Sequence, residues 1–243
     1  QTPGLILLLG VWLGLTLSEK AARRSHYEPD KLYTLVLLAL AAGLIGARLS
    51  YAAQNIAAFR SNAWGLLNLT PQMLDPLGGI LFAIFGALIF GQRKGLSLWP
   101  TLDVLTPGLA VFMIAIGFAN LASGNAFGAP ADLPWSISLW GDMRHPTQIY
   151  QILLAGLVAW FMRPGGSLQF SQPGIRFLVF LSATALAHIV IETFRGDSRT
   201  LLANIRTNQV IAWVILAVAI WFIQHRITAG ILTQKSTDGE QTS

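Results

Sequence analysis

The sequence predicts an all-α integral membrane protein with seven transmembrane helices. Hydrophobic residues make up 53% of the 243 positions and charged residues only 11%, whereas soluble domains contain about 25% charged residues. The apolar residues form seven long runs separated by polar connections, and one span of a bilayer takes about 20 such residues. No remaining stretch could build a separate water-soluble core, so we expect one transmembrane domain over residues 1–233.

The apolar runs justify this count in chain order. The first, about residues 3–17, comes before its basic residues Lys20, Arg23 and Arg24, which is the reverse of a cleaved signal peptide. We predict the other spans over about residues 32–53, 78–92, 104–121, 148–162, 177–194 and 209–223. Residues 234–243 have the polar composition of a disordered tail.

Lysine and arginine positions predict the orientation. The loops after spans one, three and five and the tail hold ten of them: Lys20, Arg23, Arg24, Lys31, Arg93, Lys94, Arg163, Arg176, Arg226 and Lys235. The opposite side holds Arg60, Arg144, Arg195, Arg199 and Arg206, with Arg48 near that end of its span. Because cytoplasmic loops are enriched in basic residues, we expect a cytoplasmic C-terminus and an N-terminus outside. Scattered in this way, the net charge of +5 argues against nucleic-acid binding.

The chain contains no cysteine. It therefore has no disulfide, no thiolate metal site and no thiol nucleophile of its own, and any thiol chemistry must use the thiol of a partner. His145 and His188 have no carboxylate or thiolate cluster at ligand spacing around them, so we expect neither a metal nor a cofactor.

The densest polar region runs from Gly117 to Tyr150, beside apolar segments. Polar groups near the hydrocarbon are costly unless partnered, so such a cluster is a functional-site hypothesis. Its second half, residues 144–150, reads Arg-His-Pro-Thr-Gln-Ile-Tyr and places proline in the first turn of a helix, where its missing N–H costs nothing. His145 then lies at a helix N-terminus, where anionic head groups are stabilised. Taken singly, His145 could also cap the helix, and Tyr150 could belong to an interfacial aromatic belt.

Residues 144–150, following a Gly/Asn-rich segment that ends in Gly124 and Gly128, resemble the signature region of the bacterial prolipoprotein diacylglyceryl transferases. The resemblance extends to residues 46–51, 78–79, 192–195 and 208–209. It implies seven spans in the bacterial inner membrane and a site toward the outer leaflet. It also implies the reaction: the diacylglyceryl group of phosphatidylglycerol passes to the lipobox cysteine of a prolipoprotein signal peptide, releasing glycerol phosphate. The partners implied are that lipid, the signal peptide and the bilayer.

The chain departs from the family pattern at several functional positions. The family has a histidine where this chain has Leu77, arginines at Gly117 and His188, a glutamate at Asn125 and a tyrosine at Pro3. Because of the first three departures, loss of transfer with retained binding of phospholipid or lipoprotein is the alternative function. A transporter is disfavoured by the absence of internal repeats in the sequence.

The remaining residues supply candidates for each role. Arg48, Arg144 and Arg195 are the phosphate ligands that we predict, since arginine is a planar cation suited to phosphate. The resemblance adds five further substrate-binding residues: Asn120, Gly124, Gly128, Gln148 and Tyr150. With Leu77 in place of the family histidine, His145 and His188 are the candidate bases for the thiol. His188 lies four residues before Glu192, a spacing that allows either a catalytic pair or a hydrogen bond that only packs helices.

Overall fold

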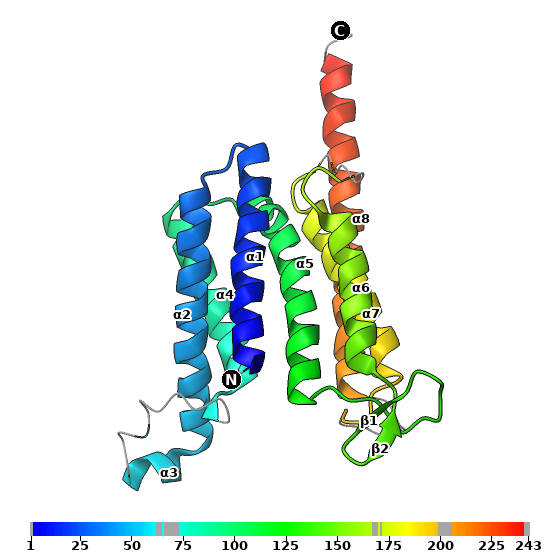
Figure 1. Cartoon of the computed structure of the whole chain (residues 1–243). Helices are drawn as coiled ribbons and strands as arrows, with labels where there is room; N and C mark the ends of the chain where they lie inside the picture. The colour runs from blue at the N-terminus through cyan, green and yellow to red at the C-terminus, as the bar shows by residue number, and fades with distance from the viewer. Residues whose placement is uncertain are drawn as a thin grey trace. The chain divides into compact units, whose positions relative to one another are not determined.

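The structure is a computed structural model that describes residues 2–61, 65, 73–166, 170, 172–198 and 206–240. Figure 1 shows the elements in chain order. They are α1 (Thr2–Arg24), α2 (Pro29–Gln54), α3 (Ile56–Ser61), α4 (Pro76–Arg93), α5 (Leu98–Ser123), β1 (Ile137–Leu139), β2 (Asp142–Arg144), α6 (Thr147–Met162), α7 (Ile175–Glu192) and α8 (Thr207–Glu240).

The described residues have the architecture of an integral membrane protein, as predicted. Six helices are long and apolar enough to cross a membrane, namely α1, α2, α4, α5, α7 and the Thr207–Thr228 part of α8. The remaining predicted span is α6, an apolar helix of only 16 residues. Each of the seven apolar segments therefore falls on a helix, while the short α3 and the hairpin β1–β2 were not predicted.

Several helices extend beyond the apolar segments that predict them. α1 continues through its basic residues to Arg24, and α8 reaches Glu240, so it includes most of residues 234–243. Hydropathy reports only the part of a helix that is apolar, whereas backbone hydrogen bonds continue through polar residues.

Large apolar side chains point outward from these helices. Trp12, Leu153 and Trp221 are 64%, 65% and 58% exposed. Exposed apolar surface on this scale marks contact with an apolar environment, and lipid tails supply one for a transmembrane helix.

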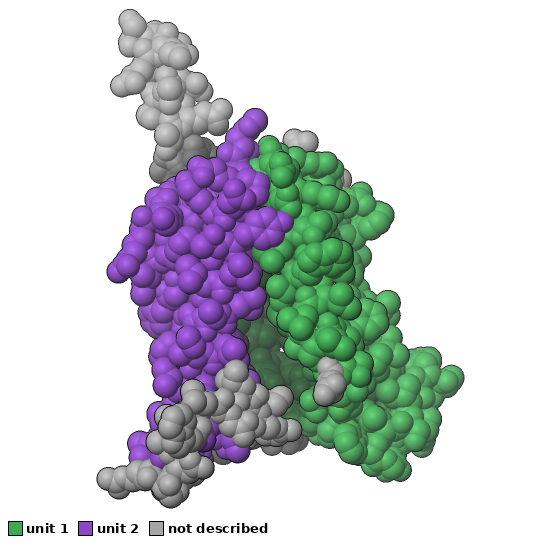
Figure 2. Space-filling model, turned by 60° about the vertical axis from the view of Figure 1, so that its left-hand side comes forward, with its two compact units in different colours: residues 1–25, 102–243 green, residues 26–101 purple. Residues whose placement is uncertain are grey.

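Contacts divide the chain into two compact units, residues 26–101 (unit 2) and residues 1–25 with 102–243 (unit 1), coloured separately in Figure 2. In unit 2, α2 packs closely on α4. A Cβ added at Gly46 would lie 2.2 Å from Cβ of Phe82, and one at Gly78 would lie 2.2 Å from Cβ of Ser50. Small residues of this kind let helix backbones approach in a membrane.

In unit 1, α1 packs on α5 where Gly14 faces Gly108. A Cβ at Gly14 would lie 2.9 Å from the carbonyl oxygen of Gly108, and Ser18 donates a hydrogen bond to the Leu105 carbonyl oxygen at 3.4 Å. Further along, Ala110, Met162 and Phe180 form a buried cluster between α5, α6 and α7.

A side chain of α5 caps the N-terminus of α7. The Asp103 carboxylate accepts hydrogen bonds from the backbone N–H groups of Gly174 (2.5 Å) and Phe177 (2.8 Å). It thereby satisfies donors at the N-terminus of α7 that have no partner within that helix. This contact positions α7, which carries His188 and Glu192 at its other end.

Candidate functional site

A short backbone segment, residues 127–131, connects the polar motifs of unit 1. On one side, His145 N–H donates to the Ala129 carbonyl oxygen at 3.1 Å and Ala131 N–H to that of Met143 at 2.9 Å. On the other, Ala129 N–H donates to the Phe194 carbonyl oxygen at 2.8 Å and Gly196 N–H to that of Phe127 at 2.9 Å. The segment therefore pairs with residues 143–145, in β2 and just before α6, and with the residues that follow α7.

Glycine is required where these backbones meet. A Cβ at Gly128 would lie 2.2 Å from the His145 carbonyl oxygen, and one at Gly196 would lie 2.6 Å from the Gly128 carbonyl oxygen. Real Cβ atoms do not approach backbone oxygens this closely. The predicted site residue Gly128 thus acts through close backbone approach, and Gly196, which sequence reasoning missed, does the same.

The hairpin β1–β2 leads into Arg144. Its turn residues Trp140 and Gly141 have φ of 56° and 85°, the left-handed conformation that two-residue hairpin turns require. Figure 1 shows the hairpin at the end of unit 1 where α5 and α7 end and α6 begins. The Trp140 indole N–H donates to the Gly124 carbonyl oxygen at 3.0 Å, so the turn is tied to the end of α5.

The first turn of α6 is held by two buried side chains. Thr147 donates from Oγ1 to the Ala126 carbonyl oxygen at 2.6 Å, and Gln148 from Nε2 to the Asn125 carbonyl oxygen at 2.8 Å. Both side chains are at most 1% exposed. Gln148 Oε1 is buried without a hydrogen-bonding partner among the described residues. The observed role of Gln148 is to bind the segment after α5.

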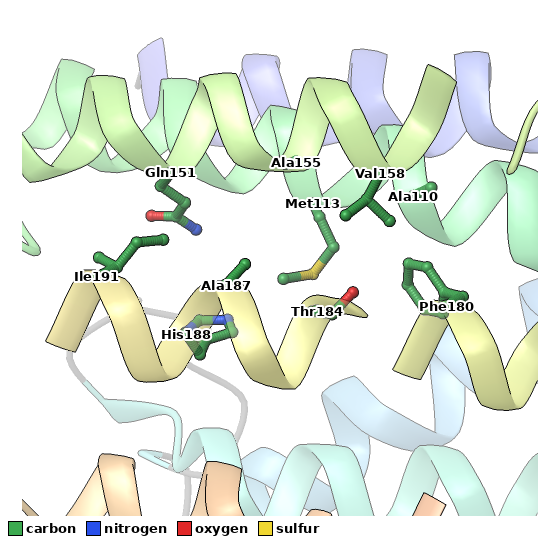
Figure 3. A pocket seen from close by; sticks show the side chains of 10 residues that line it. All are labelled: Ala110, Met113, Gln151, Ala155, Val158, Phe180, Thr184, Ala187, His188 and Ile191. Atoms are coloured by element: carbon green, nitrogen blue, oxygen red, sulfur yellow. The ribbon is translucent and has the colours of Figure 1, made fainter. Parts of the chain in front are cut away.

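One turn further along α6, Gln151 forms a pair that the sequence did not suggest. Its Oε1 accepts from Asn120 Nδ2 at 3.2 Å, which links α5 to α6. Gln151 also lines a small cavity of about 20 Å³ between α5, α6 and α7, together with Thr184 and His188 of α7 (Figure 3). The spacing of three residues from Gln148 places both amides on one helix face.

The Arg144 guanidinium donates hydrogen bonds to three nearby acceptors. It donates to Asp142 Oδ2 at 2.5 Å, to the Leu139 carbonyl oxygen at 3.0 Å and to that of Gly128 at 3.4 Å. Its guanidinium carbon lies 5.0 Å from the ring centre of Phe127. Its side chain is 14% exposed.

Arg195 is paired with two carboxylates. It donates to Asp197 at 2.9 and 3.0 Å, and its Nη1 lies 3.2 Å from Glu192 Oε1. Burial disfavours its charge, but the hydrogen bond and Coulombic attraction from Asp197, with a further contribution from Glu192, outweigh burial and raise the pKa of Arg195. Arg195 therefore stays a cation, with 20% of its side chain exposed.

Glu192 is 1% exposed and receives three partners. Besides Arg195, its carboxylate accepts from Ser198 Oγ at 2.5 Å and from Asn208 Nδ2 at 3.3 Å. It thereby joins the end of α7, the following loop and the start of α8. No hydrogen bond joins Glu192 to His188 among the described residues, and His188 faces the cavity in Figure 3.

The side chains of His145, Tyr150 and Phe194 form an aromatic cluster between the start of α6 and the end of α7. The His145 ring centre lies 5.1 Å from that of Phe194 and 6.2 Å from that of Tyr150, and the Tyr150 and Phe194 centres are 6.0 Å apart. His145 Nδ1 lies 3.3 Å from the Tyr150 hydroxyl. The cluster brings a candidate base next to the Arg195 segment.

Comparison with known proteins identifies the group to which the chain is related. The sequence profile described as "Prolipoprotein diacylglyceryl transferase" matches residues 2–225. The chain belongs to this family. Proteins named phosphatidylglycerol–prolipoprotein diacylglyceryl transferase are similar to it in Thermosynechococcus vestitus (28% identical, covering 90% of this chain and 85% of that protein) and in Synechococcus elongatus (28%, covering 88% and 79%). One in Chloroflexus aggregans is 27% identical, with 92% and 84% covered.

Arg48 has different surroundings from Arg144 and Arg195, the other two predicted phosphate ligands. It belongs to unit 2 and is 4% exposed. Its guanidinium donates to the carbonyl oxygens of Met73 (2.8 Å) and Gly65 and lies 5.1 Å from the ring centre of Phe59. Arg48 therefore supports the backbone of unit 2, a role that its position near the end of a span did not reveal.

The structure describes the surroundings of two positions at which the chain departs from the family pattern, Gly117 and Leu77. A Cβ at Gly117 would lie 2.7 Å from Ile152 Cγ1, so α5 and α6 pack through a position that leaves no room for the family arginine. Leu77 lies in the first turn of α4 and is 66% exposed. An imidazole at that position would not disturb a packed core.

Proposed function

We propose that the chain transfers the diacylglyceryl group of phosphatidylglycerol to the lipobox cysteine of prolipoproteins. The family membership over residues 2–225 and the names of the relatives support this reaction. The observation within unit 1 that carries the proposal is the pairing of residues 127–131 with both the Arg144 and the Arg195 segments. This one backbone segment therefore lies beside two arginines from separate motifs.

Two arginines so placed suit the phosphate that leaves in this reaction. As the bond between glycerol carbon and phosphate oxygen breaks, negative charge gathers on the phosphate, and prepositioned cations stabilise it. Arg144 and Arg195 would exchange carboxylate partners for phosphate oxygens. Both are partly exposed, which leaves an approach for the lipid.

The nucleophile comes from the acceptor, since the chain contains no cysteine. Its thiol attacks the glycerol carbon as a thiolate, and the thiol proton needs an acceptor. His188 and His145 are the candidate imidazoles. His188 faces a cavity of about 20 Å³, near the smallest volume that admits one water, so the diacylglycerol tails would lie along exposed apolar helix surfaces instead.

The bias of basic residues supports a bacterial inner-membrane protein with the site toward the outer leaflet. Single cysteines at two exposed serines would test this orientation in intact cells. Ser138→Cys, in the hairpin, should react with a membrane-impermeant thiol reagent, whereas Ser25→Cys, in the basic loop after α1, should not. The reverse labelling contradicts both the orientation and the leaflet.

The function is tested by complementation. A bacterial strain depleted of its own transferase receives the chain, and a lipobox reporter is examined by mass spectrometry for the added diacylglyceryl group. We expect modification with the wild-type chain and its loss with Gly128→Ala, because the new Cβ would collide with the His145 carbonyl oxygen. Gly156→Ala in α6 is the matched control, since no atom lies within 4 Å of the added Cβ. An unmodified reporter with a well-expressed wild-type chain rejects the proposal.

A second candidate is a relative that binds phospholipid or lipoprotein without transfer. The observation that favours it is the pairing of each arginine with a carboxylate, Arg144 with Asp142 and Arg195 with Asp197. If the wild-type chain leaves the reporter unmodified and Leu77→His restores modification, this second candidate holds. Efficient transfer by the wild-type chain, with no gain from Leu77→His, excludes it.

A further inference from the structure

The Tyr150 hydroxyl lies between two side chains with different hydrogen-bonding abilities. The Trp135 indole N–H donates to the Tyr150 oxygen at 2.9 Å, and His145 Nδ1 lies 3.3 Å from the same oxygen. Within the described ranges, this oxygen has no other hydrogen-bonding partner. The three residues form a chain from the hairpin region to the candidate site.

Trp135 is held in this arrangement although 59% of its surface is exposed. An exposed indole N–H could bond to solvent instead. Trp135 lies within a turn in which Ser136 donates from its N–H to the Leu133 carbonyl oxygen (3.0 Å) and from Oγ to that of Ala131 (2.7 Å). The turn fixes the backbone beside Trp135, and from there the indole N–H reaches Tyr150.

The donor and acceptor roles in this chain follow from chemistry. An indole N–H can only donate, so Tyr150 must be the acceptor of that bond. The tyrosine hydrogen is then available for the contact with His145. When it is donated, Nδ1 of the neutral imidazole acts as the acceptor, and the ring proton resides on Nε2.

The opposite arrangement makes poorer use of the same groups. With a proton on Nδ1, His145 would donate to Tyr150, whose oxygen would then accept two hydrogen bonds. The tyrosine hydrogen would have no acceptor among the residues that the structure describes. Both arrangements contain two hydrogen bonds, but only the first gives the tyrosine hydrogen an acceptor, so the first is favoured.

We propose that Trp135 is a positioning residue that, through Tyr150, holds neutral His145 in the tautomer protonated at Nε2. In this tautomer His145 presents a hydrogen-bond donor at Nε2 and has no free lone pair there. Such a ring suits contact with an anionic phosphate oxygen, and it is not prepared to remove the proton of a thiol. The phosphate assignment rests on the proposed function, whereas the tautomer does not.

The tautomer can be measured on the full-length protein in lipid nanodiscs. Nitrogen-15 NMR of histidine-labelled protein, at a pH where the imidazoles are neutral, distinguishes Nδ1–H from Nε2–H rings. His145→Gln assigns the signals among the four histidines. We expect the Nε2–H form in the wild type and a shift toward the other form in both Tyr150→Phe and Trp135→Phe. The shift should be about fivefold in Tyr150→Phe, which loses the neutral hydrogen bond to Nδ1, and smaller in Trp135→Phe, which keeps it.

Trp140→Phe is the matched control, because its indole N–H donates to a backbone oxygen away from His145. An Nδ1–H ring in the wild type, or an unchanged ratio in Trp135→Phe and Tyr150→Phe, overturns the proposal.

Adding glycerol phosphate to the same samples tests separately whether His145 contacts a phosphate. We expect the His145 Nε2 signal to move in the wild type and to move less in Trp135→Phe. If the wild-type signal does not move, the proposed contact between His145 and phosphate is wrong. Absence of reporter modification in the complementation experiment would count only against the transferase proposal.

Discussion

Arg48 and Arg195 are the same residue type near the ends of apolar helices, but their partners differ. Arg48, in unit 2, donates to backbone carbonyl oxygens and contacts the rings of Tyr51 and Phe59. Arg195, in unit 1, is bound by the carboxylates of Glu192 and Asp197 and keeps part of its side chain exposed.

The comparison separates two roles of an arginine beside a membrane. Backbone carbonyl groups cannot leave, and a buried carbonyl without a donor destabilises the fold. A carboxylate beside a partly exposed arginine can give way to a phosphate, since both anions accept from the same guanidinium fork. Arg48 is therefore the better candidate for a structural role, and Arg195 for exchange of its carboxylate partners with a phosphate.

The largest expected effect is on the stability of unit 2. Arg48→Ala leaves two carbonyl acceptors without a donor, at about 1–3 kcal/mol each, so we expect a loss of about 2–6 kcal/mol in thermal or denaturant unfolding. Arg48→Lys, whose single ammonium lacks the fork, should fall between wild type and alanine. A fully stable Arg48→Ala protein with weakened lipid binding would reverse the comparison.

Glu192→Gln should have the next largest effect. It removes the charge that anchors Arg195 and accepts from Ser198, and hydrogen bonds to charged groups contribute about 1.5–3 kcal/mol. We expect reporter modification and phosphatidylglycerol binding to fall together, because both depend on Arg195. If modification is lost while lipid binding persists, the result instead supports the prediction that His188, paired with Glu192, acts as the catalytic base. Ser198→Ala, which keeps the charge, is the control and should have a smaller effect.

Direct removal of the cations sharpens the comparison further. We expect Arg195→Ala and Arg144→Ala each to weaken binding of anionic lipid by about 1.5–3 kcal/mol, measured in nanodiscs of defined composition. Arg93→Ala, at the exposed end of α4, should leave binding unchanged. Equal losses at all three positions would indicate general surface charge.

The smallest effect concerns Asp75 of unit 2, whose carboxylate caps the N-terminus of α4. Hydrogen bonds from Ser50 and from the backbone of Gly78 and Leu77 lower the pKa of Asp75. A lowered folded pKa contributes stability above the unfolded value of about 3.9, and this contribution is lost as pH falls through the folded pKa. Thermal unfolding should therefore show a small loss of stability at low pH that is reduced in Asp75→Asn. An identical pH profile for both proteins would contradict the role of Asp75.

Sequence reasoning located the apolar helices and proposed members of the site. Hydropathy suffices for the helices because apolar length decides which segments enter a bilayer. The family resemblance brought Asn120, Gly128, His145 and Arg195 into one hypothesis, and the structure places all of them in unit 1. Their assigned roles stay predictions.

The hairpin and several partners of the site residues could not be predicted, because they depend on contacts that composition does not encode. The strands β1 and β2 have three residues each, too few for an alternating pattern, and their Trp-Gly turn lacks the usual Asn-Gly or Asp-Gly signal. Asp197, two residues after Arg195, could have been found by examining charges at short spacing. The Met73 and Gly65 acceptors of Arg48 could not, because they are backbone oxygens, which every residue has.

The contact of α1 with α5 also has a consequence in time. Ser18 and its acceptor Leu105 are 87 residues apart, and all of unit 2 lies between them in the sequence. At a synthesis rate of about 5–20 residues per second, α1 waits about 4–17 s before that partner is made. During this delay the small-residue surface around Gly14 faces lipid or a temporary neighbour, so the ribosome completes unit 2 before unit 1 can close.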